Sequence, residues 1–271
     1  MQNWIELFPP KTKDMLCRPL IIRARMAEAD PGFFADDLAV NVCDRLGLLH
    51  MKVEPPLTRI EMHRVMARTL FYDSLIRKHL QDRPDLVVVN LGSALNTRFN
   101  RVDNGRLRWY DVDWPDVTHI RKIFFPDHER VTTIGQPVFD EAWPLMVKYD
   151  EPEQLVFLAD NLLSYLQEKE VRQLFDLIAS NFPGALLYCD VVSRSSKRLK
   201  LPEPYVFYLN KVTDIKYIEY RVKLEQTWSA GTLYPEKQSS GTRLLNRLPL
   251  YRDLNQIMQL RFNRQQKWTD T

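Results

Sequence analysis

The segment DLVVVNLGSALNTRF, residues 85–99, constrains the fold more than any other part of the chain. Its apolar run, residues 86–91, stops at Gly92 and is followed by a short polar turn and the start of a helix. Such a run is typical of a strand that is buried on both faces of a parallel sheet. A tight turn between this kind of strand and a helix N-terminus is where α/β proteins bind nucleotides. The segment therefore predicts a nucleotide-type cofactor at the edge of a parallel sheet.

A second strand-like segment ends in acidic residues about twenty positions later. It reads WYDVDWP over residues 109–115, with Asp113 at the end of the strand and Pro115 at the start of a helix. A carboxylate at that place can accept hydrogen bonds from both hydroxyls of a ribose. Asp111 lies two residues earlier, on the same face of an extended strand, and is the competing candidate. We predict that Asp113 holds the ribose.

Helical patterns occupy the first 82 residues, and short apolar runs alternate with helices after them. The longest predicted helix, residues 58–80, begins at Thr58 with Glu61 three positions on, which is typical of a capping box. Five apolar runs between residues 85 and 192 alternate with predicted helices, and one of these helices spans residues 140–148. This alternation predicts an α/β fold with a doubly wound, mostly parallel sheet.

We expect two domains, a helical N-terminal cap or lid over residues 1–82 and a core over residues 83–271. After residue 192 the pattern predicts strands at 221–229 and 256–262, the second antiparallel at the end of the sheet. The polar stretch between these two strands is expected to be a loop.

Composition and charge exclude several classes of protein. Hydrophobic residues make up 45% of the chain and charged residues 27%, the net charge is +3, and no run approaches the ~18 apolar residues of a membrane span. The basic clusters are too short for a nucleic-acid surface. No secretory signal is visible, and the three cysteines lack metal or disulfide spacing. We expect a cytoplasmic protein with no metal and no nucleic-acid or membrane partner. The sequence carries no signal for the oligomeric state.

Four segments, in matching order and spacing, resemble the leucine carboxyl methyltransferase and tetracenomycin-type polyketide O-methyltransferase family. VVNLGSALNTR is similar to the signature V-x-L-G-A-G-L-D-T-R, and WYDVDWPDV is similar to F-E-V-D-x-P. LADNLLSYL, at residues 158–166, is similar to A-E-x-x-L-x-Y-L, and RTLFYDSLIR, from Arg68, matches an arginine and amphipathic stretch before the first strand. The resemblance covers roughly residues 18–192. It implies a Rossmann-like core, S-adenosylmethionine as cofactor and S-adenosylhomocysteine as product.

The resemblance also implies roles for individual residues. Arg68 would pair with the methionyl carboxylate, which suits a guanidinium fork, and Asp160 would lie near the methionyl ammonium and sulfonium. Gly92 would let the backbone approach the cofactor. Near the adenine the chain has QPVFD, in which Gln136 or Asp140 would have to reach the exocyclic amine. The complete predicted cofactor set is Arg68, Gly92, Ser93, Asn96, Asp113, Gln136 and Asp160. None of the five histidines stands in a motif, so the sequence names no general base.

The implied activity is methylation of a carboxylate or hydroxyl on a small molecule, polyketide-like or another metabolite. A protein C-terminal carboxylate is the alternative acceptor within the family. The chain departs from the signatures at Ala94, Asn96, Pro137 and Asp160, and an alanine forced to positive φ costs on the order of 1 kcal/mol. The first three of these departures support a second alternative, a relative that has lost catalysis and acts as a binding or partner protein. A nicotinamide-dependent oxidoreductase is disfavoured because the glycines of G-x-G-x-x-G are missing.

Overall fold

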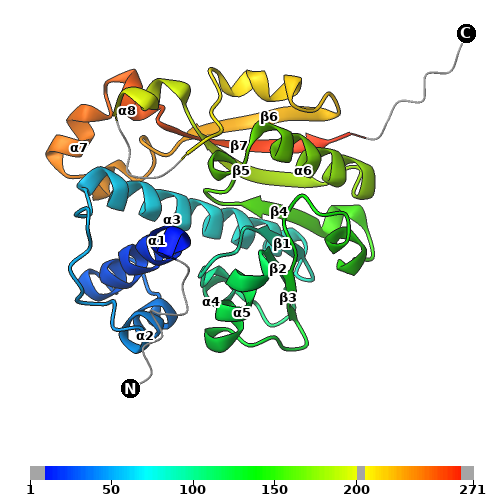
Figure 1. The fold of residues 1–271 in the computed structure, drawn as a ribbon, viewed down its shortest axis with the longest axis horizontal. Helices are drawn as coiled ribbons and strands as arrows, with labels where there is room; N and C mark the ends of the chain where they lie inside the picture. Colours follow the sequence, from blue (N-terminus) through cyan, green and yellow to red (C-terminus); the bar gives the residue numbers. More distant parts are fainter. Residues whose placement is uncertain (1–9, 200–204, 264–271) are drawn as a thin grey trace, which may run out of the picture.

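A seven-stranded sheet runs through the computed structural model, which describes residues 10–199 and 205–263 (Figure 1). The strand order is β3-β2-β1-β4-β5-β7-β6. The first five strands pair in parallel, and β7 pairs antiparallel with both β5 and β6. The bounds are β1 Val87–Leu91, β2 Arg108–Asp113, β3 Val131–Gly135, β4 Leu155–Ala159, β5 Leu186–Val192, β6 Val222–Ser229 and β7 Asn255–Phe262.

This topology confirms the predicted doubly wound, mostly parallel sheet. From β1 the chain proceeds outward to β2 and β3 on one side, and then returns to β4 and β5 on the other side. The strand order therefore reverses between β1 and β4. In open α/β sheets, the carboxyl ends of the two strands at such a reversal flank the ligand crevice.

Helices cover both faces of the sheet (Figure 1). α3 packs Tyr72 and Ile76 against one face, and α6 packs Phe175 and Ile178 against the other. α1 and α2 share a separate apolar cluster with α5. The α-helices are α1 Pro10–Ala29, α2 Asp37–Arg45, α3 Arg59–Asp82, α4 Arg98–Val102, α5 Pro115–Phe124, α6 Glu168–Asn181, α7 Ser240–Leu245 and α8 Pro249–Arg252. Because α3 belongs to the predicted cap and yet lies on the sheet, the domain boundary at residue 82 stays a prediction.

The capping box predicted at the start of α3 is confirmed. Thr58 Oγ1 accepts the Glu61 N–H at 3.1 Å, and Glu61 Oε2 accepts the Thr58 N–H at 3.3 Å. These reciprocal bonds satisfy two backbone donors at the helix terminus, which fixes where the helix begins.

Three local predictions were wrong. Residues 140–148 form only a short 3-10 turn, Trp143–Met146, because Pro144 removes a backbone donor there. The stretch between the last two strands is not all loop, since α7 begins at the N-cap Ser239 and α8 begins with Pro249. β7 is antiparallel as predicted, but β6 rather than β7 forms the end of the sheet.

All three cysteines, Cys17, Cys43 and Cys189, are buried, and none of them forms a disulfide bond. Within residues 10–199 and 205–263, no helix has both the length and the apolar character that a membrane crossing requires.

Candidate cofactor site

A cavity of about 470 Å³ opens at the carboxyl ends of β1 and β4, at the point where the strand order reverses. The turns after these strands form its floor, and α1 and α3 contribute side chains to its wall. Its size lies within the range of about 300–1,000 Å³ that is usual for ligand pockets. The residues of the predicted cofactor set that line it are Arg68, Gly92, Ser93, Asn96, Asp113 and Asp160.

Two residues of the turn after β1 adopt left-handed backbone conformations. Gly92 has φ +64 and Ala94 has φ +45. A Cβ added to Gly92 would lie 2.7 Å from Leu162 Cδ1, so the turn after β4 also requires glycine here. At Ala94 the side chain already exists, and its left-handed conformation is costly for alanine. Sequence reasoning anticipated this strain on the condition of a positive φ, and the structure meets that condition.

Asp113 is buried in the cavity wall at the end of β2. Its carboxylate accepts the N–H groups of Ala94, at 2.7 Å, and Trp114, at 2.8 Å. Burial raises the pKa of Asp113 to about 6 against the lowering effect of these two bonds. Asp111 does not line the cavity, since it is fully buried and bonded to Arg121. Of the two acidic candidates, only Asp113 lines the cavity.

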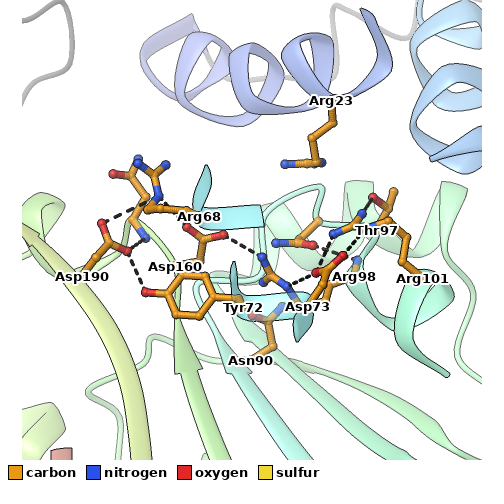
Figure 2. A network of polar contacts seen from close by, with 12 residues as sticks. Arg23, Arg68, Tyr72, Asp73, Asn90, Thr97, Arg98, Arg101, Asp160 and Asp190 are labelled. Carbon is orange, nitrogen blue, oxygen red and sulfur yellow. Dashed lines mark hydrogen bonds and ion pairs between the residues drawn. The ribbon is translucent and has the colours of Figure 1, made fainter. Parts of the chain in front are cut away.

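Arg68 and Asp160 form an ion pair at the other end of the cavity (Figure 2). Arg68 Nε donates to Asp160 Oδ1 at 2.9 Å, and Arg98 Nη2 donates to Asp160 Oδ2 at the same distance. Burial raises the pKa of Asp160, but Arg68 and Arg98 outweigh it and bring the pKa down to about 2. Sequence reasoning assigned Arg68 and Asp160 to opposite charges of one zwitterion. Their pairing places a cation and an anion side by side, which suits that assignment.

Arg23 of α1 is a cavity residue that sequence reasoning missed. Its side chain points from α1 toward the charged cluster (Figure 2) and donates from Nη2 to the Leu95 carbonyl at 2.8 Å. Its Nε lies 3.7 Å from Asp36 Oδ2 and is buried without a hydrogen-bond partner among the described residues. Burial lowers the pKa of Arg23 to about 10. Its position could have identified it from the sequence, because Arg23 lies seven residues after Leu16 and therefore on the apolar face of α1.

The predicted adenine contact Gln136 does not line the cavity. Val138 and Phe139 of the same loop lie there instead, and Phe139 meets Trp114 edge-on with ring centroids 5.9 Å apart. The loop turns because the Asp140 N–H bonds to the Pro137 carbonyl, and the Val138 carbonyl accepts Trp143 Nε1. Asp140, the alternative contact, accepts the Ala142 N–H. This loop therefore contributes apolar surfaces to the cavity, and the Gln136 contact stays a prediction.

The cavity fits S-adenosylmethionine in chemistry. A mixed-charge pair suits the methionyl zwitterion, a strand-end carboxylate suits the ribose, and ring faces suit the adenine. The hydroxyl of Ser93 is a further polar group on the wall, buried and without a hydrogen-bond partner in the described part of the chain. Among those residues, no group of three or more His, Cys, Asp or Glu side chains could hold a metal ion.

Known proteins match this chain in sequence and in fold. The family pattern described as Leucine carboxyl methyltransferase matches residues 17–179. The tetracenomycin polyketide synthesis O-methyltransferase TcmP of Streptomyces glaucescens is 29% identical over 133 residues, which are 49% of this chain and 48% of TcmP. The match thus spans about half the length of that relative.

Two solved structures show the fold over most of the chain. A Thermobifida fusca YX protein classed as a methyltransferase has a TM-score of 0.56 at 15% identity, covering 90% of this chain and 94% of its own. The magnesium protoporphyrin IX methyltransferase ChlM of Synechocystis PCC 6803, solved with S-adenosylhomocysteine, has a TM-score of 0.51 at 12% identity, covering 88% and 98%. The family match covers more than half of the sequence and shows that the chain belongs to the leucine carboxyl methyltransferase family of S-adenosylmethionine-dependent methyltransferases.

Proposed function

We propose that this protein transfers the methyl group of S-adenosylmethionine to an oxygen of a small molecule, preferentially a carboxylate oxygen. The observation that carries the proposal is one cavity that joins the Arg68–Asp160 pair, Asp113 and an apolar wall. Arg68 would bind the methionyl carboxylate, Asp160 the ammonium and Asp113 the ribose hydroxyls. Gly92, Ser93 and Asn96 would form the turn under the cofactor.

The acceptor would lie beneath α1 and α3. The side chains that these helices contribute to the cavity are mostly apolar, namely Met15, Leu16, Pro19 and Val65. Arg23 and Thr69 add polar groups to the same wall. An acceptor with an apolar body and an anionic group fits this surface, because the body removes apolar area from water and the cation of Arg23 balances the charge.

The absence of a histidine from the cavity lining favours a carboxylate over a phenol or alcohol. All five histidines lie in the described residues, and none lines the cavity. His63, on α3, instead contacts the Leu233 carbonyl through Nε2 at 3.0 Å. Glu170 lines the cavity, but its Oε2 accepts the Gln167 N–H at 2.7 Å. A carboxylate, with a pKa near ~4, is already ionised at neutral pH and needs no base, whereas a phenol near ~10 benefits from one.

The protein would act mainly by alignment. When bound, the cofactor would supply a methyl group on a sulfonium, which would pass to the acceptor oxygen as S-adenosylhomocysteine leaves. Arg68 and Asp160 would fix the methionyl end, and Arg23 would hold the acceptor anion in line. The helices over the cavity would exclude water. Holding two reactants in such a geometry is among the larger contributions an enzyme makes to rate.

Calorimetric titration with S-adenosylmethionine, S-adenosylhomocysteine and NAD tests the cofactor. We expect micromolar binding of the first two and none of NAD. If folded protein binds none of the three, the result would instead support the alternative that this protein has lost catalysis and acts as a binding or partner protein.

Matched acceptors test the substrate class. Aromatic carboxylic acids, the corresponding benzylic alcohols and phenols, and a peptide ending in leucine would each be offered with labelled cofactor. We expect label in the small acids as base-labile methyl esters. Label in the peptide alone would assign the protein to the branch that methylates protein C-termini.

The role of Arg23 has its own test in this assay. Arg23→Met is expected to raise the acceptor KM about tenfold or more, as for a lost charge-assisted contact, with little change in S-adenosylhomocysteine affinity. Arg59→Met, at an exposed position of α3, is the control. A loss of cofactor affinity instead would place Arg23 at the methionyl carboxylate.

A further inference from the structure

Arg121 of α5 contacts the turn after β1 without lining the cavity. It is 3% exposed. Its Nη1 donates to the carbonyls of Ala94, at 3.1 Å, and Asn96, at 2.9 Å. Its Nε and Nη2 donate to Asp111 Oδ2 at 3.0 and 2.6 Å. One guanidinium thus joins the carboxylate of Asp111, within β2, to two backbone carbonyls of the turn after β1.

Asp111 fixes the orientation of this guanidinium. The carboxylate is fully buried, and its Oδ1 accepts Asn90 Nδ2 at 2.7 Å and Trp109 Nε1 at 2.9 Å. Both oxygens are therefore engaged, one by neighbouring side chains of the sheet and the other by Arg121. The guanidinium also lies over the Phe125 ring, 4.8 Å from its centroid. A donor fork held this firmly constrains the backbone to which it bonds.

The backbone to which Arg121 bonds includes Ala94, whose left-handed conformation is unfavourable for alanine. Ala94 has φ +45, and its N–H donates to Asp113 while its carbonyl accepts from Arg121. The residue is thus held on both sides of its Cα. Glycine would adopt this conformation without cost, but alanine disfavours it and persists there only when the surroundings impose it.

We propose that Arg121, with Asp111 as its counter-ion, is a positioning residue that keeps Ala94 left-handed and thereby keeps Asp113 set for the ribose. The inference rests on the proposed cofactor site. It gives Asp111 the role of counter-ion to Arg121. The sequence had offered Asp111 as the alternative to Asp113 for the ribose contact. It also explains how the chain tolerates alanine at Ala94.

A double-mutant cycle with Arg121→Met and Ala94→Gly tests the proposal. The methionine keeps apolar contact with Phe125 and removes the donors. Two quantities would be measured in all four proteins, hydrogen exchange of the backbone amide at position 94 without ligand, and the Kd for S-adenosylhomocysteine. We expect Arg121→Met alone to speed the exchange and raise the Kd at least tenfold, and to change either less than threefold in the Ala94→Gly background. Equal losses in both backgrounds would overturn the proposal.

Two further variants keep the test decisive. Arg121→Lys retains the charge and can reach Asp111 but cannot bond both carbonyls, so the proposal expects it to resemble Arg121→Met, and wild-type behaviour would refute it. Should Arg121→Met fail to fold, the same cycle is run with Arg121→Lys. Arg130→Met removes a comparable bridge from Asp103 to the Leu107 carbonyl, away from the cavity, and should leave position 94 unchanged. If wild-type protein binds no S-adenosylhomocysteine, the proposed function fails. The exchange measurement at position 94 still tests whether Arg121 holds Ala94 in its left-handed conformation.

Discussion

The turns that follow β1 and β4 are built on the same backbone arrangement. Each has a non-glycine residue in the left-handed conformation, Ala94 with φ +45 and Asn161 with φ +59. Each of these residues donates its N–H over 2.7 Å to a buried aspartate, Ala94 to Asp113 and Asn161 to Asp190. Burial raises the pKa of both aspartates to about 6.

The two turns differ in what keeps the strained residue in place. Asparagine tolerates the left-handed region, and Asn161 Oδ1 also accepts the Tyr205 hydroxyl at 3.2 Å. Alanine has neither advantage, and at Ala94 the support comes from Arg121, which lies outside the turn on α5. A turn can therefore keep its geometry after an unfavourable substitution when a buried donor outside the turn holds its carbonyls.

The turn after β4 also adjoins a buried charge network, and breaking that network is expected to have the largest effect. Asp73 is 1% exposed and accepts Arg98 Nε at 2.8 Å and Arg101 Nε at 2.7 Å (Figure 2). Burial raises the pKa of Asp73, but the two arginines outweigh it and lower the pKa, so the carboxylate is charged at neutral pH. Removing one partner of a buried pair leaves uncompensated charge and costs about 3–5 kcal/mol.

Urea unfolding of Asp73→Asn and Asp150→Asn would measure this cost with the same chemical change at two sites. Asp150 pairs with Arg108 with 77% of its side chain exposed, where a pair contributes about 0–1 kcal/mol. We expect the free energy of unfolding to fall by several kcal/mol in Asp73→Asn only. Similar losses at both sites would show that the network does not stabilise this side of the cavity.

The second prediction uses the pH dependence of cofactor affinity to distinguish Asp113 from Asp190. Because Asp113 would bind the ribose as a carboxylate and its pKa is about 6, cofactor affinity should rise about tenfold between pH 5 and 7. The stability of the unliganded protein should change in the opposite direction. A folded-state pKa raised from 3.8 to about 6 means that the native chain binds an extra proton in that window, so the unfolding free energy falls as the pH rises from about 4 to 6.

Asp190 has a pKa in the same range and is the group to exclude. Titrations with S-adenosylhomocysteine across this pH range should give a flat profile for Asp113→Asn and retain the slope in Asp190→Asn. The reverse pattern would move the pH-sensitive contact from the turn after β1 to the turn after β4.

Sequence reasoning located the elements of the cavity because each is encoded locally. The run that forms β1 and the capping box of α3 are short-range patterns, and the family motifs carry Arg68, Gly92, Asp113 and Asp160 to strand ends and to the helix over them. A parallel sheet brings the carboxyl ends of its strands to one edge. The convergence of these residues was thus predictable from their places along the chain.

The contacts that distinguish the two turns were not predictable in that way. Arg121 reaches Asp111 and the Ala94 carbonyl only because α5 packs against the edge of the sheet where β1 and β2 lie in register, with Asn90 opposite Asp111. Such contacts depend on packing between segments far apart in sequence. That Gln136 does not line the cavity has a related reason, since the turn after β3 is set by its own hydrogen bonds.

The smallest expected effect isolates the strain at Ala94 itself. Ala94→Gly removes a side chain from a left-handed position, a relief of about 1–2 kcal/mol, and adds backbone freedom to the unfolded chain, a cost of about 0.5–1 kcal/mol. The net expectation is a gain of about 0–1.5 kcal/mol in the free energy of unfolding. Ala142→Gly is the matched control, because Ala142 is exposed, has φ −82 and gains nothing from glycine, so it should lose about 0.5–1 kcal/mol. Urea unfolding that shifts the two variants in opposite directions would show that Ala94 is strained in the native state. A loss at both positions would mean that Ala94 is not strained in the native state, and that the turns after β1 and β4 are alike in energy as well as in geometry.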